Sequence, residues 1–460
     1  MMLRLVAVAL CLLAPRLAVA QAPDWRRVTD DAAQLLSQYI RINTENPPGT
    51  TVESAAFLAD LLGAAGIETE ILAGAVPDKP ILVGRLRGRR GGGKPIVLLN
   101  HMDVVPADPQ RWTFPPFSGE IRDGLIYGRG AIDMKGLGIA QLMALRLLAE
   151  RGERPERDLV FLAVPDEEVG GTHGAAWLAQ NRPDLLDAEA VWDEGGIGAT
   201  DVLPVPALFI SVTEKQVLWL RLVAEGPAGH ASRPYPNAAP RKLTAALTRV
   251  LDAPPAPRLT PVTRQVFKRV GRAVPGWEGF AMRRLNNPVV WLFADGLLQG
   301  EPWSAAMTRD TIALTMLDAG YKPNVIPERA SATLDCRLLP DTSPQAFMAQ
   351  LTKTIDDPDV RIEILQSPHA APVSPTDTPL FEAMRRAAAT VYPDVVITES
   401  MTVGGTDSRF FRQRGVPAYG FFPVMLPKQL TSTVHGVDER LPVSDLGKAV
   451  QVIYTALKTL

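Results

Sequence analysis

The chain has 460 residues, of which 46% are hydrophobic and 21% are charged, and its formal net charge is −2. This length is enough for more than one domain with a large buried core. The near balance of charge, with no basic tract beyond residues 87–90, gives no reason to expect a nucleic-acid partner.

Residues 1–20 have the pattern of a secretory signal peptide. Arg4 precedes an apolar stretch at residues 5–13 that is too short to span a bilayer, and small residues lead to a cleavage site at Ala20. We therefore expect a secreted or periplasmic mature protein with no stable membrane span; an uncleaved N-terminal anchor is the alternative. Cys336 would then be the only cysteine of the mature chain, so no internal disulfide is expected.

After this segment, helix and strand patterns alternate along the chain. Short apolar runs indicate buried strands, and apolar positions three and four residues apart indicate helices. The predicted elements are helices at 24–42, 51–65, 135–151 and 174–180, strands at 81–86, 96–99, 159–164 and 190–192, and a turn between short strands at 120–127. The basic and glycine-rich residues 87–93 predict an exposed hairpin tip. The alternation predicts an α/β fold, with a mostly parallel sheet and helices on both faces.

The pattern changes near residue 207 and changes back after residue 367. Alternating segments that are typical of antiparallel strands occupy 207–212, 217–223 and 331–338, a helix is predicted at 343–355, and the α/β style returns at 379–392, 417–422 and 443–457. We therefore predict a discontinuous α/β catalytic domain of residues 21–210 and 368–460, interrupted by an inserted α+β lid and dimerisation domain of residues 211–367.

Chemistry-bearing residues follow the predicted strands where these end. His101 and Asp103 close the strand at 96–99, and Glu167 with Glu168 follow the strand at 159–164. Ligands of open α/β sheets bind at the carboxyl ends of the strands, and zinc binds histidine nitrogen and carboxylate oxygen. A solvated charged loop is the alternative for the glutamate pair alone, but an apolar strand delivers the pair to a sheet edge. The pattern indicates a metal-dependent active site.

The chain also resembles the co-catalytic di-zinc metallopeptidases, which include aminoacylases, carboxypeptidase S, the glutamate carboxypeptidases, acetylornithine deacetylase and succinyl-diaminopimelate desuccinylase. It is most similar to aminoacylase, carboxypeptidase S and the secreted N-fatty-acyl-amino-acid hydrolases. The motifs that carry the resemblance are HMDVVP at 101–106, YGRGAIDMKG at 127–136, PDEEVGG at 165–171, DEG at 193–195, GHAS at 229–232, NVIP at 324–327, GGTDSR at 404–409 and HGVDER at 435–440.

The resemblance implies two Zn²⁺ ions per subunit, although Co²⁺ or Mn²⁺ could also occupy such a site. One ion would bind His101 and Glu194, the other would bind Glu168 and His435, and Asp133 would bridge them. Asp193, which precedes Glu194, is the alternative ligand at that position.

The resemblance also implies the catalytic roles. Asp103 would hydrogen-bond the free ring nitrogen of His101, and Glu167 would be the general base that activates the metal-bridging water. His230 would come from the inserted domain of a partner subunit in a homodimer and stabilise the oxyanion.

Substrate contacts are implied in the same way. Arg337 and Asn324 would hold the substrate carboxylate, and the backbone at Gly404 and Gly405 would line the cleft. The expected reaction is hydrolysis of an amide bond next to a free carboxylate, in an N-acyl amino acid or at the carboxyl end of a peptide. The alternatives are a dipeptidase with the same site, or a zinc-binding or ligand-binding relative that has lost catalysis.

Residues 253–312 are rich in proline and aromatic side chains, and we predict a helical elaboration of the inserted domain there. If part of this segment lined the cleft, it would favour a bulky apolar acyl group or side chain, since each buried methylene contributes about 0.8 kcal/mol. The alternative is that these aromatics form the core of the segment itself.

Overall fold

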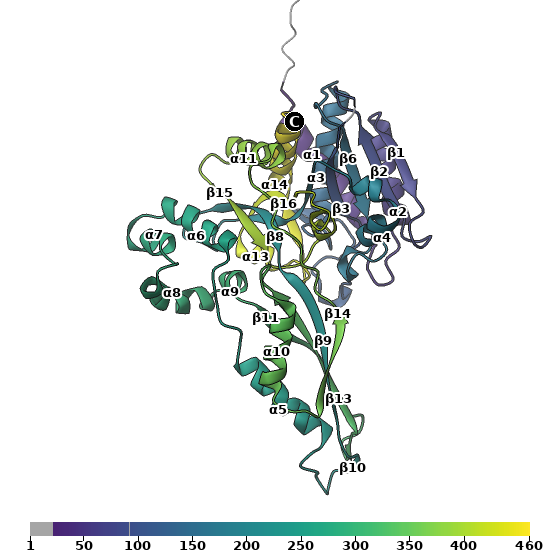
Figure 1. Ribbon diagram of the computed structural model, residues 1–460. Coiled ribbons are helices and arrows are strands. Elements are labelled where there is room, and N and C mark those ends of the chain that lie inside the picture. Colours follow the sequence, from purple (N-terminus) through teal and green to yellow (C-terminus); the bar gives the residue numbers. More distant parts are fainter. Residues whose placement is uncertain (1–21, 92) are drawn as a thin grey trace, which may run out of the picture.

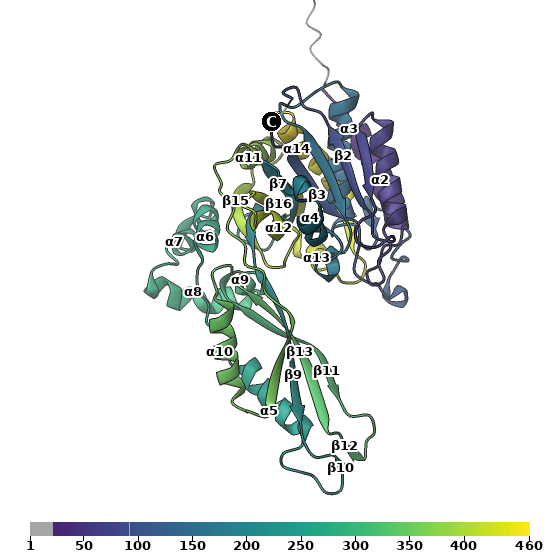
Figure 2. The ribbon, with the colours of Figure 1, turned by 45° about the vertical axis from the view of Figure 1, so that its right-hand side comes forward.

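The structure is a computed structural model that describes residues 22–91 and 93–460, so the predicted signal peptide at 1–20 lies outside the described residues. An α/β body carries an inserted domain that extends away from it, and this arrangement is clear in both views (Figures 1 and 2). Within the described part of the chain, no helix is long and apolar enough to cross a membrane.

An eight-stranded sheet forms the centre of the body, in the order β1-β2-β6-β3-β7-β16-β8-β15. Parallel pairs join β6 to β3, β3 to β7, β7 to β16 and β8 to β15. The strands are β1 (Glu68–Leu72), β2 (Ile81–Leu86), β3 (Ile96–His101), β6 (Leu159–Val164), β7 (Ala190–Ala199), β8 (Ala207–Glu214), β15 (Val396–Thr402) and β16 (Ala418–Leu426).

Helices cover both faces of this sheet, which confirms the predicted fold class. Side chains such as Leu36, Leu142 and Leu446 form the core on one face, and Leu178 and Phe411 belong to the core on the other. The first face carries α1 (Trp25–Arg41), α2 (Val52–Ala64), α3 (Lys135–Glu150), α11 (Pro379–Val391) and α14 (Val443–Leu457), and the second carries α4 (Ala175–Asn181) and α12 (Ser408–Arg412).

The hairpin predicted across residues 87–93 is wrong. β2 and β3 do not pair with each other, because β6 lies between them, antiparallel to β2 and parallel to β3. Every residue of β6 is buried. A strand that is apolar along its whole length is stabilised by a neighbour on each edge, and a local β2–β3 hairpin would leave β6 without one of them.

A smaller sheet of three strands has the order β17-β5-β4. Its strands are β4 (Ile121–Arg122), β5 (Leu125–Tyr127) and β17 (Arg440–Pro442). β5 therefore brings the chain before residue 133 next to the chain after residue 435.

The inserted domain begins where β8 passes into β9 at Lys215. It contains a four-stranded antiparallel sheet in the order β11-β13-β9-β14, with two helices packed on one face around Leu220, Leu243 and Leu334. Its elements are β9 (Gln216–Glu225), α5 (Ala239–Asp252), β11 (Thr311–Ala319), β13 (Arg329–Leu338), α10 (Pro344–Ile355) and β14 (Val360–Gln366), and a short β10 (Gly229–His230) pairs with β12 (Val325–Ile326) at the tip.

The segment at 253–312 folds into four helices, α6 (Pro261–Ala273), α7 (Gly276–Arg283), α8 (Pro288–Gly300) and α9 (Pro302–Thr308). Val266 and Val270 of α6 pack with Phe209 of β8 and Met401 of β15. The helical segment therefore rests on the edge of the body sheet, to the side of the inserted domain (Figure 1).

Candidate metal centre and active site

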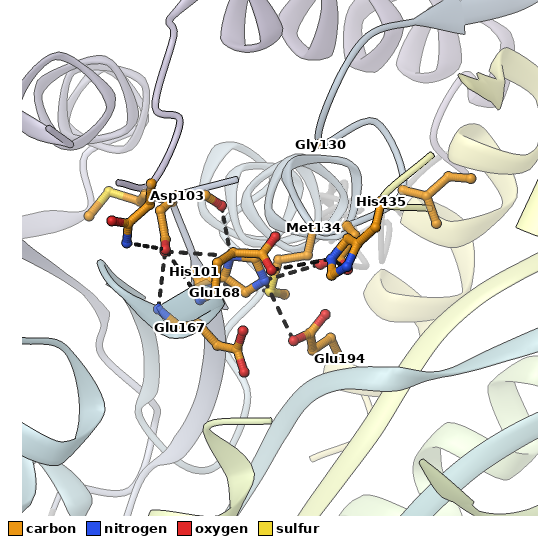
Figure 3. A network of polar contacts seen from close by, with 12 residues as sticks. His101, Asp103, Gly130, Met134, Glu167, Glu168, Glu194 and His435 are labelled. Carbon is orange, nitrogen blue, oxygen red and sulfur yellow. Dashed lines mark hydrogen bonds and ion pairs between the residues drawn. The ribbon is translucent and has the colours of Figure 1, made fainter. Parts of the chain in front are cut away.

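The strand ends bring one histidine and two carboxylates together. His101 ends β3, Glu194 lies in β7, and Asp133 lies in the loop before α3. His101 Nε2 is 3.2 Å from Asp133 Oδ1. It is also 3.5 Å from Glu194 Oε1 (Figure 3). Ligands about 2.1 Å from a tetrahedral zinc lie about 3.4 Å from one another, so these three side chains fit a metal ion.

A second group shares Asp133 with the first. His435 Nε2 is 3.1 Å from Asp133 Oδ2 and 3.2 Å from Glu168 Oε2. His435 has a positive φ of 57°, in a loop that follows α13 (Lys428–Thr431). The other oxygen of Glu168, Oε1, is buried with no hydrogen-bond partner. One carboxylate thus contacts both histidines through different oxygens, which is the arrangement that a pair of metal ions requires.

The electrostatics of the site favour divalent cations. Burial, together with the neighbouring charge of Asp133, raises the pKa of Glu194 to about 8. Hydrogen bonds to Asp133 and Glu168 raise the pKa of His435 to about 11. Burial and the nearby Glu194 raise the pKa of Glu167 well above its usual range. Crowded carboxylates repel each other in this way when they lack a counter-charge, and a bound cation removes that repulsion.

Of the two adjacent candidates on β7, Glu194 is the one next to His101. Asp193 is buried on the other side of the strand, where its Oδ2 accepts a hydrogen bond of 2.7 Å from Ser408 Oγ. Alternate residues of a strand point to opposite faces, so only one of the pair can face the histidines. Gly420 on β16 allows this close packing, because a Cβ there would lie 2.0 Å from the Glu194 carbonyl oxygen.

Asp103 connects the first histidine to the glutamate pair. Its Oδ1 accepts a hydrogen bond from the Glu167 N–H at 3.2 Å, and its Oδ2 accepts one from the Glu168 N–H at 3.3 Å (Figure 3). His101 Nδ1 is 2.9 Å from the Asp103 carbonyl oxygen and 3.7 Å from Asp103 Oδ1, so the main-chain oxygen is the nearer acceptor. Asp103 therefore orients both the ring and the turn that carries the glutamates.

A buried ion pair supports the same turn, and sequence reasoning missed it. Asp166 has a positive φ of 77° and makes a close ion pair with Lys79. Asn46 Nδ2 donates to Asp166 Oδ1 at 3.1 Å and to Asp103 Oδ2 at 2.8 Å. Lys79 and Asn46 lie outside the motifs and far from residue 166 in sequence, so no local pattern could have identified them.

Glu439 holds the loop that carries Asp133, and its role was also missed. This fully buried carboxylate accepts hydrogen bonds from the N–H groups of Gly130, Ile132 and Asp133 at 3.1, 2.8 and 3.1 Å. Arg129 Nη1 donates to it at 2.8 Å. Glu439 belongs to the quoted HGVDER motif, so a signal for it was present in the sequence.

The two groups open onto a cavity of about 460 Å³ between the body and the inserted domain. Among the predicted substrate residues, Arg337, Gly404 and Gly405 line it, together with Glu167. Arg337 Nε and Nη2 donate to the Asp335 carboxylate at 2.7 and 2.8 Å. The wall beside the histidines is apolar and is formed by Ile132, Met134, Leu137, Ile197, Phe422 and Val434.

Residues 253–312 do not contribute to this cavity in the described part of the chain. The idea that their aromatic side chains line the cleft is therefore not supported, because the segment rests on the far side of β15. A bulky apolar group would instead contact the wall formed by α3, β7 and β16.

His230 and Asn324 are not brought to the candidate metal-ligand groups of their own chain. His230 lies in β10 at the tip of the inserted domain, where its side chain is exposed and its Nδ1 is 2.7 Å from Ser232 Oγ (Figure 1). Asn324 lies beside it, and its carbonyl oxygen accepts a hydrogen bond of 3.1 Å from the Ala231 N–H.

Comparisons with known proteins identify the family of the chain. The model of peptidase family M20/M25/M40 matches residues 97–459. The N-fatty-acyl-amino acid synthase/hydrolase PM20D1 of Mus musculus is 34% identical over 378 residues, which are 78% of this chain and 73% of that protein. Aminoacylase-1 of Sus scrofa is 31% identical over 430 residues, 92% of this chain and 93% of that protein.

A carboxypeptidase relative and a solved structure complete the comparison. The probable carboxypeptidase S-like 2 of Dictyostelium discoideum is 33% identical over 387 residues, 82% of this chain and 74% of that protein. The crystal structure of the M20 family metallo-carboxypeptidase Sso-CP2 from Sulfolobus solfataricus has a TM-score of 0.71 at 21% identity and covers 94% of this chain and 99% of its own. The fold is therefore shared with that protein.

Proposed function

Since the chain belongs to peptidase family M20/M25/M40 and is a hydrolase, we propose that it cleaves the amide bond of N-acyl amino acids, using two divalent metal ions. One observation carries this proposal: the cavity combines the paired histidine–carboxylate groups with a facing arginine and an apolar wall. An N-acyl amino acid has three matching parts, which are an amide, a carboxylate and an apolar acyl chain.

His101, Glu194, Asp133, Glu168 and His435 would hold the metal ions, with Asp133 shared between them. When bound, a pair of Zn²⁺ ions supplies Lewis-acid polarisation and lowers the pKa of water.

The chain's own residues would supply the proton transfers. Glu167 lines the cavity and lies outside both candidate ligand groups, so its carboxylate is free to act as a base. It would accept the proton of the attacking water and then pass it to the departing amide nitrogen. Asp103 would keep Glu167 in place through the hydrogen bond to its N–H.

Arg337 would bind the substrate carboxylate. Its guanidinium is presented by β13 on the cavity side of the inserted sheet and is now paired with Asp335. Arginine is suited to this role because its planar fork binds a carboxylate with two hydrogen bonds. Gly404 and Gly405 also line the cavity, and their lack of side chains leaves room for the substrate backbone.

We also propose that the active enzyme is a homodimer in which His230 and Asn324 of one subunit reach the cavity of the other. The exposed position of both residues at the tip of the inserted domain supports this, as does the edge strand β11, whose Leu314, Met316 and Leu317 are exposed. Unpaired edge strands favour pairing with another chain. We further propose that residues 1–20 are a signal peptide that directs export of the protein.

The test is a hydrolysis panel with metal-loaded enzyme. N-acyl derivatives of one amino acid, from acetyl to long-chain acyl, should show kcat/KM rising about fourfold per methylene while the chain still contacts the wall. Cleavage of dipeptides with a free amino group, and not of N-acyl amino acids, would favour the dipeptidase. Bound zinc without turnover of any substrate would favour an inactive binding relative.

A further inference from the structure

The helical segment at 261–308 carries an apolar surface that the active site does not use. α8 has no buried residue. Its side chains Val289, Leu292, Phe293 and Leu297 share one face and are between 64% and 81% exposed. Apolar residues with this spacing normally mark the face of a helix that packs against a core. Here the same face points into solvent.

The polar side chains of α8 face the protein instead. Gln299 Nε2 donates to Asp295 Oδ1 at 3.1 Å and to Thr308 Oγ1 at 3.3 Å, and Gln299 Oε1 is buried. Ser304 Oγ of α9 donates to the Leu298 carbonyl oxygen. These contacts fix α8 on α9 with its apolar face outward, so the exposure is built into the packing of the segment.

α7 adds aromatic side chains of the kind found at lipid interfaces. Trp277 is 69% exposed, and its ring stacks on Phe280 with the centroids 5.4 Å apart. The Arg284 guanidinium lies over the Phe280 ring, 6.0 Å from its centroid. Tryptophan and arginine together suit the headgroup region, because both have an apolar body and a polar end.

The charge of the segment is opposite to that of the whole chain. Residues 261–300 contain six basic and two acidic side chains, whereas the full chain has a net charge of −2. Arg264, Lys268 and Arg272 repeat every four residues and are exposed along one stripe of α6. Both views show α6, α7 and α8 as one lobe at the side of the body (Figures 1 and 2).

We propose that this lobe docks the enzyme on an anionic lipid surface. The apolar face of α8 and Trp277 would enter the boundary between headgroups and acyl chains, and the basic stripe of α6 would contact the phosphates. α8 has 13 residues, too few to span a bilayer, so it would lie in the interface. A two-fold contact between copies fits less well, because it would place the basic stripes near each other. This inference does not depend on the proposed substrate.

Vesicle binding of the full chain tests the proposal. The wild-type protein should sediment with vesicles of mixed phosphatidylglycerol and phosphatidylcholine, and more weakly with phosphatidylcholine alone. The double variant Leu292→Ser/Leu297→Ser should lose at least about tenfold in partition coefficient. Arg264→Gln/Lys268→Gln/Arg272→Gln should lose the preference for the anionic vesicles. Both variants should keep the wild-type circular dichroism spectrum and a cooperative unfolding transition in urea, which shows that they fold.

The matched control is Ile71→Ser, which removes an exposed apolar side chain from β1 at the opposite edge of the body sheet and should leave binding unchanged. Absence of wild-type binding to either vesicle would overturn the proposal, as would equal binding by the α8 variant. Sedimentation velocity without lipid tests whether the apolar face of α8 instead binds a second copy of the chain. If Leu292→Ser/Leu297→Ser dissociates an oligomer and leaves vesicle binding unchanged, the face is an interface between copies.

Discussion

His435 Nε2 lies 3.1 Å from Oδ2 of Asp133, on the opposite carboxylate oxygen from the one that faces His101. His101 ends β3 and His435 lies in a loop more than 300 residues later in the sequence, and the Asp133 side chain is their common contact. The two candidate ligand groups therefore share Asp133, and a pair of metal ions would depend on it more than on either histidine.

Replacing the shared carboxylate should disrupt both metal positions. We expect Asp133→Ala to lose both metals, because each group loses a ligand and the charge that holds the pair together. His101→Ala or His435→Ala should each weaken one position more than the other. Metal content after dialysis, measured by mass spectrometry, checks this, and two intact metals in Asp133→Ala would contradict the bridging role.

Removing the arginine of the inserted sheet should affect substrates with a free carboxylate. We expect Arg337→Gln to raise KM for an N-acyl amino acid by about tenfold or more, since a hydrogen-bonded ion pair is lost. KM for the corresponding amide should change little. Arg221→Gln, on the same sheet but outside the cavity, is the control. An equal rise in KM for the acid and for the amide would mean that Arg337 does not bind the substrate carboxylate.

The carboxylate behind the Asp133 loop should matter for stability. We expect Glu439→Gln to lower the free energy of unfolding by about 3–5 kcal/mol, because it leaves Arg129 charged and buried without its partner. Glu382→Gln removes the partner of Arg385 in a half-exposed pair and should cost less than about 1 kcal/mol. Urea unfolding measures the free energy of unfolding of both variants. Equal losses of this free energy would contradict the structural role assigned to Glu439.

Complementation between inactive variants tests the trans role of the tip histidine. His230→Ala and Glu167→Ala should each be inactive, whereas a mixture should recover up to about a quarter of wild-type activity, since random pairing forms dimers with one complete site. Subunit exchange must be verified with differently tagged chains. Persistent inactivity after exchange would place His230 outside the site.

Several of the side chains that the structure brings together could be placed from the sequence, because they end or follow a recognisable element. His101 closes an apolar strand, and Glu167 and Glu168 follow another, so the geometry of a parallel sheet brings them to one edge. Lys79 could not be predicted, because its contact with Asp166 exists only after β2 and β6 have paired. The pairing of β2 with β3 was wrongly predicted for the same reason. The turn signal at residues 87–93 is local and does not reveal that β6 lies between the two strands.

The segment at 253–312 shows that the sequence can predict an apolar helix face without predicting its contacts. Its apolar spacing predicts that α8 has an apolar face, but spacing does not determine what that face contacts. Gln299 and Ser304 decide this through their hydrogen bonds, and they turn Leu292 and Leu297 outward. Composition alone therefore favoured either a core or a cleft wall. The packing divides the aromatic side chains: Phe267 is buried and Trp303 packs against the core, whereas Trp277 and Phe293 are exposed.

The most direct test of the account is to measure metal content and turnover together in Glu167→Ala. Glu167 lines the cavity but belongs to neither candidate ligand group, so both metals should remain bound. kcat on an N-acyl amino acid should fall by at least about 10²–10⁴-fold, as expected for the loss of a general base. Loss of a metal in this variant, or turnover close to the wild-type value with both metals bound, would contradict the assignment of Glu167 as the base.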